Sequence, residues 1–398
     1  MKTVLFFTDL LVGTHIPELN GVYERARRYG WHVVEIEYSH LIRPLGDYIK
    51  TWKPAGCIVD CSPLTSVLDR TAFRGLPVVY LHPDHETLKR PCTCVKNDPV
   101  PLAQLAAREL SALDCAAYGY VGWSEPTSWS EDRRTAFINE MKTRGVAAKS
   151  FTEHWSSRDR LHCEKKLAAW LKSMPKPCGI FAANDDTASL VTEVCHFVGL
   201  NCPKDVAVIG VDNLEIICEN AVTSLSSIEV DFTEAGRLAA DLLARLLSDP
   251  KRKPERATFA SARVVRRHST RPQKACDAHV ARALERIRRE ACFGLKAIDV
   301  INDFGASRRT AEQRFRAATG KTILEEINDH RLERAFQLLR RQDYPISLIA
   351  EQCGWKRDVF LKRIFKKRTG MTMREWRRKA LAPTLGPKPG DPVSPARD

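Results

Sequence analysis

The chain has 398 residues, enough for two or three domains, and hydrophobic residues make up 43% of it. Its formal net charge is +14, and a net +12 of this lies between Lys274 and Ala380, where 26 Lys and Arg residues oppose 14 Asp and Glu residues. No apolar run approaches the roughly 18 residues that cross a bilayer, and the N-terminus has no signal-peptide cleavage pattern, so we expect a cytoplasmic protein without membrane contact.

Short apolar strands alternate with amphipathic helices through the first half of the chain. The expected strands are 3–7, 31–36, 56–60, 77–81, 94–96, 116–122, 148–151, 179–183 and 206–211. The expected helices are 16–28, 101–113, 131–144 and 158–173. Continuous apolar strands between helices indicate parallel sheets that are covered on both faces. About 265 residues are too many for one such sheet, so the pattern predicts two α/β lobes.

Polar residues follow four of these strands at the point where each strand ends. They are Asp9, Asn97, Asp98, Asn184, Asp185 and Asp212. In parallel α/β sheets, ligands bind in the crevice at the carboxyl ends of the strands. Carboxylates and amides in that position offer the acceptors and donors that sugar hydroxyls need. Each of these residues also suits the N-cap of a following helix, but for the whole set we favour a sugar-binding crevice.

The C-terminal quarter contains one pattern twice. Each copy has an apolar segment, a turn glycine and a basic segment, at 298–301, Gly305 and 307–315, and again at 346–350, Gly354 and 356–365. Each copy predicts a helix-turn-helix. The segment between them predicts a helix that buries Leu324, Ile327, Leu332, Ala335 and Leu338. Two such units can enter successive major grooves, which lie roughly 34 Å apart along DNA.

We expect the recognition helices to begin near Ser307 and Lys356, with base-facing side chains near their N-termini. This selects Arg308, Arg309, Thr310 and Gln313 in the first unit, and Lys356, Arg357, Asp358 and Lys362 in the second. Arg and Lys pair with guanine, Gln with adenine, and Asp with cytosine. Phe315 and Phe365 should lie on the opposite, buried faces. The alternatives are that the cations contact phosphates only, or form a merely solvated surface.

This region resembles the DNA-binding domain of AraC-type transcription regulators over about a hundred residues. The resemblance rests on Arg331, Ala335, Leu338, Leu339, Ile349, Ala350, Cys353, Gly354, Trp355, Phe365, Gly370, Thr372, Glu375 and Arg377. Three positions depart from the family pattern: Leu361 stands in place of Phe, Met373 in place of Pro, and Ala311 in place of Leu. We expect such substitutions to affect packing more than DNA contact.

The preceding region resembles the periplasmic-binding-protein-like effector domain of the lactose-repressor family. It follows that family's pattern most closely at 179–185, 208–213, 225–228 and 231–236. In that family, residues corresponding to Arg133, Asp185 and Asp212 commonly line the inducer cleft, so the resemblance implies that these three bind the effector. The arginine would donate to sugar oxygens, and the acids would accept from hydroxyls.

A sensor of this kind followed by an AraC-type reader resembles the regulators of xylose operons. The resemblance implies a sugar-responsive activator with xylose as its effector, and with double-stranded DNA, RNA polymerase and a second copy of the chain as partners. We expect the multidomain fold to consist of a two-lobed α/β sensor and an all-α tandem helix-turn-helix domain. The expected bounds are 1–267 for the sensor, 268–276 for a polar linker, 277–380 for the DNA-binding domain and 381–398 for a disordered tail.

Motifs of enzymes and metal sites are not found in the sequence. It has no glycine-rich phosphate loop, nucleophile elbow or zinc-hydrolase motif, so we expect no enzymatic activity, cofactor or metal. Cys92 and Cys94 lie close to His82 and His85, but their spacing fits no zinc pattern. The alternatives are a different monosaccharide, a protein partner instead of a small ligand, repression instead of activation, and a sugar hydrolase fused to a DNA-binding tail.

Overall fold

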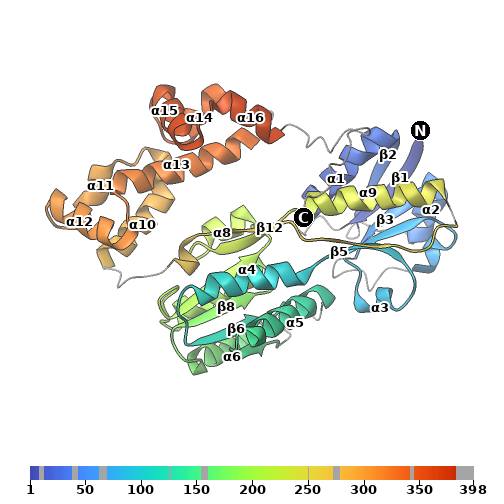
Figure 1. The fold of residues 1–398 in the computed structure, drawn as a ribbon, viewed down its shortest axis with the longest axis horizontal. Coiled ribbons are helices and arrows are strands. Elements are labelled where there is room, and N and C mark those ends of the chain that lie inside the picture. The colour runs from blue at the N-terminus through green and yellow to red at the C-terminus, as the bar shows by residue number, and fades with distance from the viewer. Residues whose placement is uncertain are drawn as a thin grey trace, which may run out of the picture. The chain divides into compact units, whose positions relative to one another are not determined.

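The structure, a computed structural model, describes residues 1–8, 13–37, 44–61, 70–124, 127–153, 160–249, 251–271, 278–340 and 345–381. It divides the chain into two compact units, Met1–Pro272 and Gln273–Asp398. The first unit holds two sheets with their helices, and the described part of the second unit is entirely helical (Figure 1). This arrangement confirms the fold class predicted from the sequence.

Two six-stranded sheets form the two lobes of the first unit. The first has the order β11-β5-β4-β3-β1-β2, and all its neighbours are parallel. The second has the order β12-β10-β9-β8-β6-β7, and only its edge strand β12 runs antiparallel. The strands are β1 (Lys2–Thr8), β2 (Trp31–Glu37), β3 (Gly56–Asp60), β4 (Val78–Leu81), β5 (Thr93–Asn97), β6 (Ala117–Val121), β7 (Ala148–Phe151), β8 (Cys178–Ala182), β9 (Val206–Val211), β10 (Ser226–Val230), β11 (Arg256–Phe259) and β12 (Ala262–Val265).

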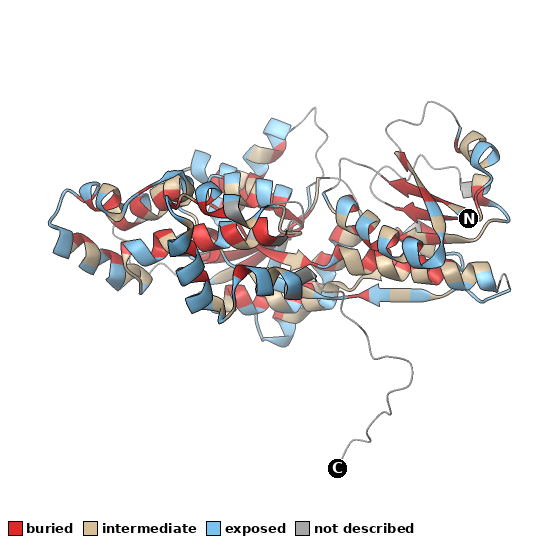
Figure 2. Ribbon diagram, turned by 90° about the horizontal axis from the view of Figure 1, so that it is seen from above, coloured by how far each residue is buried: buried red, intermediate tan, exposed pale blue. Residues whose placement is uncertain are grey.

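Helices cover both faces of these sheets, as the continuous apolar strands predicted. The helices are α1 (His15–Tyr29), α2 (Leu45–Trp52), α3 (His85–Leu88), α4 (Pro99–Ser111), α5 (Ser128–Thr143), α6 (Arg160–Ser173), α7 (Asp185–Phe197), α8 (Glu215–Asn220) and α9 (Phe232–Ser248). In β1, Val4 and Phe6 belong to one core cluster, whereas Leu5 and Phe7 belong to another. Figure 2 shows the result as strands that are largely buried and helices that are buried on one side only.

The chain passes between the two lobes three times. It crosses from β5 to α4, from β10 to α9, and from β11 to β12. Backbone hydrogen bonds join these crossings: Asp98 donates to Phe259 over 2.9 Å, and Asp231 donates to Ser261 over 2.9 Å. Each lobe is therefore built from discontinuous parts of the sequence, and the three crossings lie together.

The predicted linker begins too early. Ser269 and Thr270, in a short 3₁₀ helix over His268–Thr270, are buried in the sensor. The Ser269 hydroxyl donates to Val208 O over 2.6 Å, and Thr270 Oγ1 donates to Glu109 Oε1 over 3.0 Å. A short polar run suggested a linker, but these hydroxyls satisfy buried acceptors on β9 and α4. Residues 272–277 and the predicted tail from 382 lie outside the described residues.

The second unit contains the two predicted helix-turn-helix units. Its helices are α10 (Ala278–Glu290), α11 (Ala297–Asn302), α12 (Arg308–Thr319), α13 (Ile323–Arg340), α14 (Ile346–Gln352), α15 (Asp358–Thr369) and α16 (Met373–Leu381). The first helix-turn-helix consists of α11 and α12, and the second consists of α14 and α15. Each has its own core cluster, in which Phe315 and Phe365 are fully buried as predicted.

The repeat extends to individual hydrogen bonds, at a spacing of 50 residues. The Thr319 hydroxyl donates to Phe315 O, and the Thr369 hydroxyl donates to Phe365 O, each over 2.8 Å. Glu325 then accepts from the backbone and hydroxyl of Thr322, as Glu375 does from Thr372. Both recognition helices end at a left-handed glycine, with φ of 75° at Gly320 and 71° at Gly370.

Packing in this unit agrees with the sequence except in the connecting helix. The three departures from the AraC pattern, Ala311, Leu361 and Met373, are all buried, as expected for packing positions. Leu324 was predicted to be buried but is 53% exposed, and its neighbour Ile323 is buried instead. Ile323 is the first residue of α13 and packs into the first core cluster, so that helix turns Leu324 away from the core.

Candidate functional site

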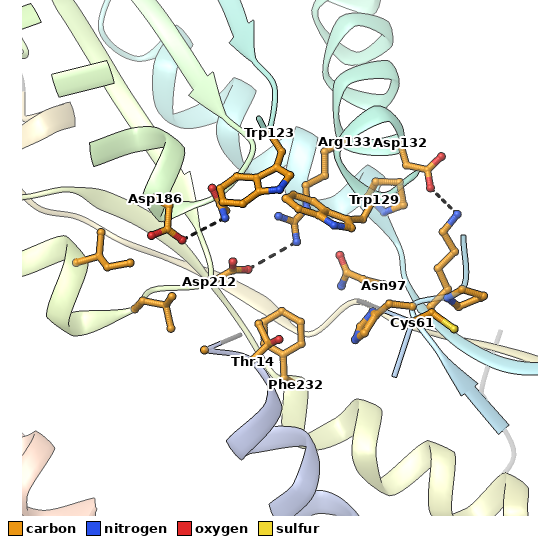
Figure 3. A pocket seen from close by; sticks show the side chains of 18 of the residues that line it. Thr14, Cys61, Asn97, Trp123, Trp129, Asp132, Arg133, Asp186, Asp212 and Phe232 are labelled. Atoms are coloured by element: carbon orange, nitrogen blue, oxygen red, sulfur yellow. Dashed lines mark hydrogen bonds and ion pairs between the residues drawn. The ribbon is translucent and has the colours of Figure 1, made fainter. Parts of the chain in front are cut away.

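A cavity of about 410 Å³ lies between the two lobes of the sensor. Its polar lining residues include Thr14, His82, Lys96, Asn97, Asp132, Arg133, Asn184, Asp186 and Asp212. Its apolar lining residues include Pro83, Pro99, Trp123, Trp129, Leu214, Ile216, Ile217 and Phe232. Most polar members sit at or just after the carboxyl ends of strands, or in the first two turns of α5, as Figure 3 shows for those that it labels. The volume is typical of small-molecule sites.

Arg133 occupies a buried position on α5 and is only 6% exposed. Its Nη1 donates to Ala183 O over 2.5 Å, and its Nη2 lies 3.6 Å from Asp212 Oδ1. The Trp129 ring lies under the guanidinium, 4.9 Å from the ring centroid. The Trp129 ring thus covers one face of the guanidinium, and the bond to Ala183 O fixes Nη1. These contacts hold the guanidinium in place before a ligand binds.

The cavity acids are affected by burial and by each other. Burial raises the pKa of Asp212, Arg133 opposes this change, and Asp186 adds to it. Burial also raises the pKa of Asp186. Asp212 Oδ1 has no hydrogen-bond partner within the described residues, although it is buried. A buried acceptor of this kind favours a ligand that brings a donor.

The backbone that carries Asp212 has an unusual conformation. Asp212 has a φ of 100° and Asn213 a φ of 51°, in the region that side chains seldom adopt. Such residues cost on the order of 1–3 kcal/mol each and persist where surrounding contacts hold them. Here Asn213 N donates to Ser227 Oγ over 3.0 Å, and Asn213 Oδ1 accepts from Arg267 over 2.9 Å.

Charged groups from opposite lobes meet at the edge of the cavity. Lys96, at the end of β5 in the first lobe, lies 2.5 Å from Asp132 on α5 in the second. His85, also of the first lobe, lies 3.2 Å from the same carboxylate. On the first-lobe side, His82 Nε2 lies 2.6 Å from the buried Glu18. Burial lowers the pKa of His82, but Glu18 and Asp60 together raise it above its ordinary value.

Of the seven predicted effector residues, four line the cavity, Asp98 and Asp185 do not, and Asp9 is not among the described residues. Asn97, Arg133, Asn184 and Asp212 line it. Asp98 instead caps α4, accepting from Val100 N over 3.0 Å, so its capping interpretation holds.

Asp185 was predicted to bind the effector but lies beneath the cavity. It is fully buried, and it accepts from Leu214 N over 2.7 Å and from the Ser227 hydroxyl over 2.6 Å. These bonds tie α7 to the strands beside it, so its carboxylate does not reach the cavity. The next residue, Asp186, lines the cavity in its place. Sequence reasoning also missed Lys96, Asp132, Trp123 and Trp129, for which only proximity to strand ends or to Arg133 gave a signal.

The predicted DNA-reading residues face outward on the first recognition helix, α12, more often than on the second, α15. Ser307 caps α12 as predicted, and its side chain accepts from Thr310 N over 3.2 Å. At about 100° per residue, Arg309, Thr310 and Gln313 all point within about 60° of the direction opposite Phe315. Arg308 is exposed at the start of α12, but it points within about 20° of the direction of Phe315 and so lies on the same side of the helix as that buried residue. Thr310 also hydrogen-bonds the Ser307 hydroxyl, so that group is partly engaged within the helix end.

The second helix begins two residues later than predicted. Arg357 is the N-cap of α15, and Lys356 precedes it, so neither lies within the helix. Asp358 lies on the same side of α15 as the buried Phe365, and Lys362 lies on the flank, 2.5 Å from Asp358. The positions equivalent to Arg309, Thr310 and Gln313 are instead Val359, Phe360 and Arg363. The predicted starts of the two recognition helices, Ser307 and Lys356, lie 49 residues apart. The repeat in the structure has a spacing of 50, so the predicted positions in the second helix are one residue too early.

Across the described ranges, no three or more His, Cys, Asp or Glu side chains are grouped so as to hold a metal ion. Within the same ranges, no helix has the length and apolar character that crossing a membrane requires.

Comparison with known proteins agrees with this architecture. A periplasmic binding protein-like domain family matches residues 88–270, and a helix-turn-helix domain family matches residues 301–379. The xylose operon regulatory protein of Escherichia coli K12 is 28% identical over 94% of this chain and 96% of its own length.

Two further relatives extend this comparison. The xylose operon regulatory protein of Haemophilus influenzae is 31% identical over 71% of this chain and 74% of its own length. A solved structure of the xylose-binding transcription activator XylR covers 95% of this chain and 98% of its own, at 25% identity and a TM-score of 0.66. The chain therefore belongs to the family of xylose operon regulatory proteins, sugar-responsive transcription regulators in which a periplasmic-binding-protein-like sensor precedes a helix-turn-helix DNA-binding domain.

Proposed function

We propose that this chain is a xylose-responsive transcription activator that binds the sugar in the cavity between its lobes. The observation that carries the proposal is the convergence of Asn97 with Arg133, Asp186 and Asp212 on one cavity from two lobes. These groups offer donors and acceptors in several directions, as a compact polyol requires. The names of the family's members support xylose as the effector.

The apolar wall of the cavity complements this polar set. The Trp123 and Trp129 rings lie 6.1 Å apart, and Phe232 lies across the cavity from them in Figure 3. Flat rings suit the C–H faces of a sugar ring, while the polar residues meet its hydroxyl edge. A free pentose has both kinds of surface, which is why we assign it to this site.

Regulation would follow from the position of the cavity between lobes. A ligand that contacts Asn97 on one side and Asp212 on the other stabilises the arrangement in which both are within reach. The Lys96–Asp132 ion pair already joins the lobes at the cavity edge. We further propose that the chain acts as a homodimer, that the sugar-bound dimer recruits RNA polymerase, and that it works in the cytoplasm, where bacterial DNA lies.

Calorimetric titration of the full chain against D-xylose, L-arabinose, D-ribose and D-glucose tests the effector. We expect the tightest binding with D-xylose, and binding of another sugar alone would replace xylose in the proposal. Asp212→Asn should weaken xylose binding by about 1–3 kcal/mol, roughly 5- to 150-fold, because buried polar groups lose their partner. Asp249→Asn, at the exposed end of α9, is the matched control and should bind as the wild type does.

Two further measurements separate the alternatives. Xylose should be recovered unchanged after long incubation, whereas its conversion to another compound would support an enzyme. A reporter placed behind the chain's operator should rise with xylose for the wild type. Asp212→Asn should shift that response to higher xylose concentration without changing DNA binding in the absence of sugar. Loss of reporter activity on addition of xylose would indicate repression.

A further inference from the structure

The outward face of the second recognition helix is apolar, unlike that of the first. Val359 is 59% exposed and Phe360 is 45% exposed. At about 100° per residue, both point within about 60° of the direction opposite the buried Phe365, with Arg363 between them. The equivalent residues of the first helix, Arg309, Thr310 and Gln313, are all polar.

The equivalence of these positions does not depend on sequence similarity alone. Both recognition helices have 12 residues and end at a left-handed glycine. Thr319 and Thr369 make matching bonds at the ends of these helices, and the Thr322–Glu325 and Thr372–Glu375 pairs cap the helices that follow. Val359 and Phe360 therefore occupy, in the second unit, the positions that face bases in a helix-turn-helix.

The surroundings of this apolar pair match a DNA surface. Lys356, Arg357, Lys366 and Lys367 are exposed near the two ends of α15. The guanidinium of Arg363 lies 5.6 Å from the centroid of the Phe360 ring, which fixes the ring beside a cation. The apolar pair is therefore surrounded by positive charge, which attracts the phosphates of DNA. A hydrophobic protein partner would not need these surrounding cations.

Among the base edges in the major groove, the C5-methyl of thymine is the apolar one. Phenylalanine and small aliphatic side chains are suited to contact it. We propose that the second unit reads its half-site through thymine methyl groups contacted by Phe360 and Val359, whereas the first unit reads by hydrogen bonds from Arg309 and Gln313. This proposal rests on DNA binding by the family and not on the identity of the sugar.

Replacing thymine by deoxyuridine removes the methyl group and nothing else, so it isolates the proposed contact. The full chain is first used to select its site from random duplexes. Each thymine of that site is then replaced in turn by deoxyuridine, and affinity is measured by fluorescence anisotropy. One or two replacements in one half-site should weaken wild-type binding about fourfold each, the effect of burying about one methyl group.

The Phe360→Ala variant is then tested on the same thymine and deoxyuridine duplexes. This variant should bind the thymine site more weakly, and it should no longer distinguish thymine from deoxyuridine at the position that Phe360 contacts. Val359→Ala should lose the distinction at a neighbouring position only. Phe293→Ala is the matched control, because Phe293 is 87% exposed in the same domain but lies off both recognition helices. It should keep the wild-type affinity and the wild-type response to deoxyuridine.

Three results would overturn the proposal. The first is a wild type that binds every deoxyuridine site as tightly as the thymine site. The second is a Phe360→Ala variant that still responds to deoxyuridine at all the wild-type positions. The third is an equal loss of affinity by this variant on selected and random DNA, which would make Phe360 a general contact. A melting curve of the variant that matches the wild type shows that the comparison is between folded proteins.

Discussion

The sensor cavity and the recognition helices both depend on charged side chains but hold them in opposite ways. Arg133 is 6% exposed and is held by Ala183 O, Asp212 and the Trp129 ring. Arg309 and Arg357 are exposed. A buried ion is stable only where partners surround it, whereas an exposed cation keeps its water until a phosphate or base replaces it. Substitutions should therefore affect folding and ligand geometry in the cavity, but only affinity on the helices.

The largest effect is expected at Arg133. Arg133→Met should lower the free energy of unfolding of the sensor by about 3–5 kcal/mol, because Asp212 and Ala183 O lose a buried partner. Urea unfolding of the full chain measures this. Arg134→Met is the neighbouring control, since Arg134 forms an exposed pair with Glu131 that should contribute less than about 1 kcal/mol. Equal effects of the two substitutions would remove the contrast between buried and exposed arginines.

Asp185 should give a smaller effect that depends on pH. Burial, followed by Asp212, raises the pKa of Asp185 to about 7, whereas an unfolded aspartate titrates near pH 4, roughly. Between these values the folded chain keeps a proton that the unfolded chain has lost, so this residue's contribution to stability falls as pH rises and is constant above about 7.

Asp185→Asn removes that titration. The difference in unfolding free energy between the variant and the wild type should shift in the variant's favour by on the order of 4 kcal/mol between pH 4 and pH 8. Thermal or urea unfolding across that pH range gives the measurement. Asp249→Asn is the control, because Asp249 is exposed at the end of α9. A difference between Asp185→Asn and wild type that does not change with pH would contradict the raised pKa.

The two exposed arginines provide the third test. Arg309 lies on the outward face of α12, so Arg309→Ala should cost about 1–3 kcal/mol on the selected site and relax preference at one base pair. Arg357 precedes α15, so Arg357→Ala should weaken selected and random DNA alike and lower the salt slope by about one. If Arg357→Ala instead changed preference at a single base pair, the second unit would read bases from before its helix.

Lys362 should give the smallest effect. It forms an exposed pair with Asp358 four residues earlier, and such pairs contribute little to stability because water and salt screen them. Lys362→Ala should therefore change the melting temperature and the affinity for the selected site only slightly. A loss of more than about 1 kcal/mol on that site alone would show that Lys362 contacts a base after all.

Sequence patterns predicted the parts of the site that depend on local periodicity. Strand ends located Asn97, Asn184 and Asp212 at the cavity, and the amphipathic repeat located Phe315 and Phe365 in their cores. The same patterns failed where one residue decides which way a side chain points. Asp185 and Asp186 are adjacent, and only the contacts of Asp185 with Leu214 and Ser227 show that Asp186, and not Asp185, lines the cavity.

Other site residues depend on packing between segments distant in the chain. Asp132 meets Lys96 only because α5 of one lobe lies beside the end of β5 of the other. The start of α15 depends on the cap at Arg357, where no side-chain signal comparable to Ser307 marks the boundary. The resulting one-residue error in the spacing of the repeat moved the expected reading face from Val359 and Phe360 to charged neighbours.

The three crossings between the lobes also bear on how the sensor is made. β11 is an edge strand of the first sheet and β12 an edge strand of the second, and only two residues separate them. Neither lobe has all its strands until a ribosome has synthesised Arg256–Phe259 and Ala262–Val265. At roughly 5–20 residues per second, both sheets receive their last strand within about two seconds. The two lobes are thus completed almost together, late in translation, and just before synthesis of the DNA-binding domain begins.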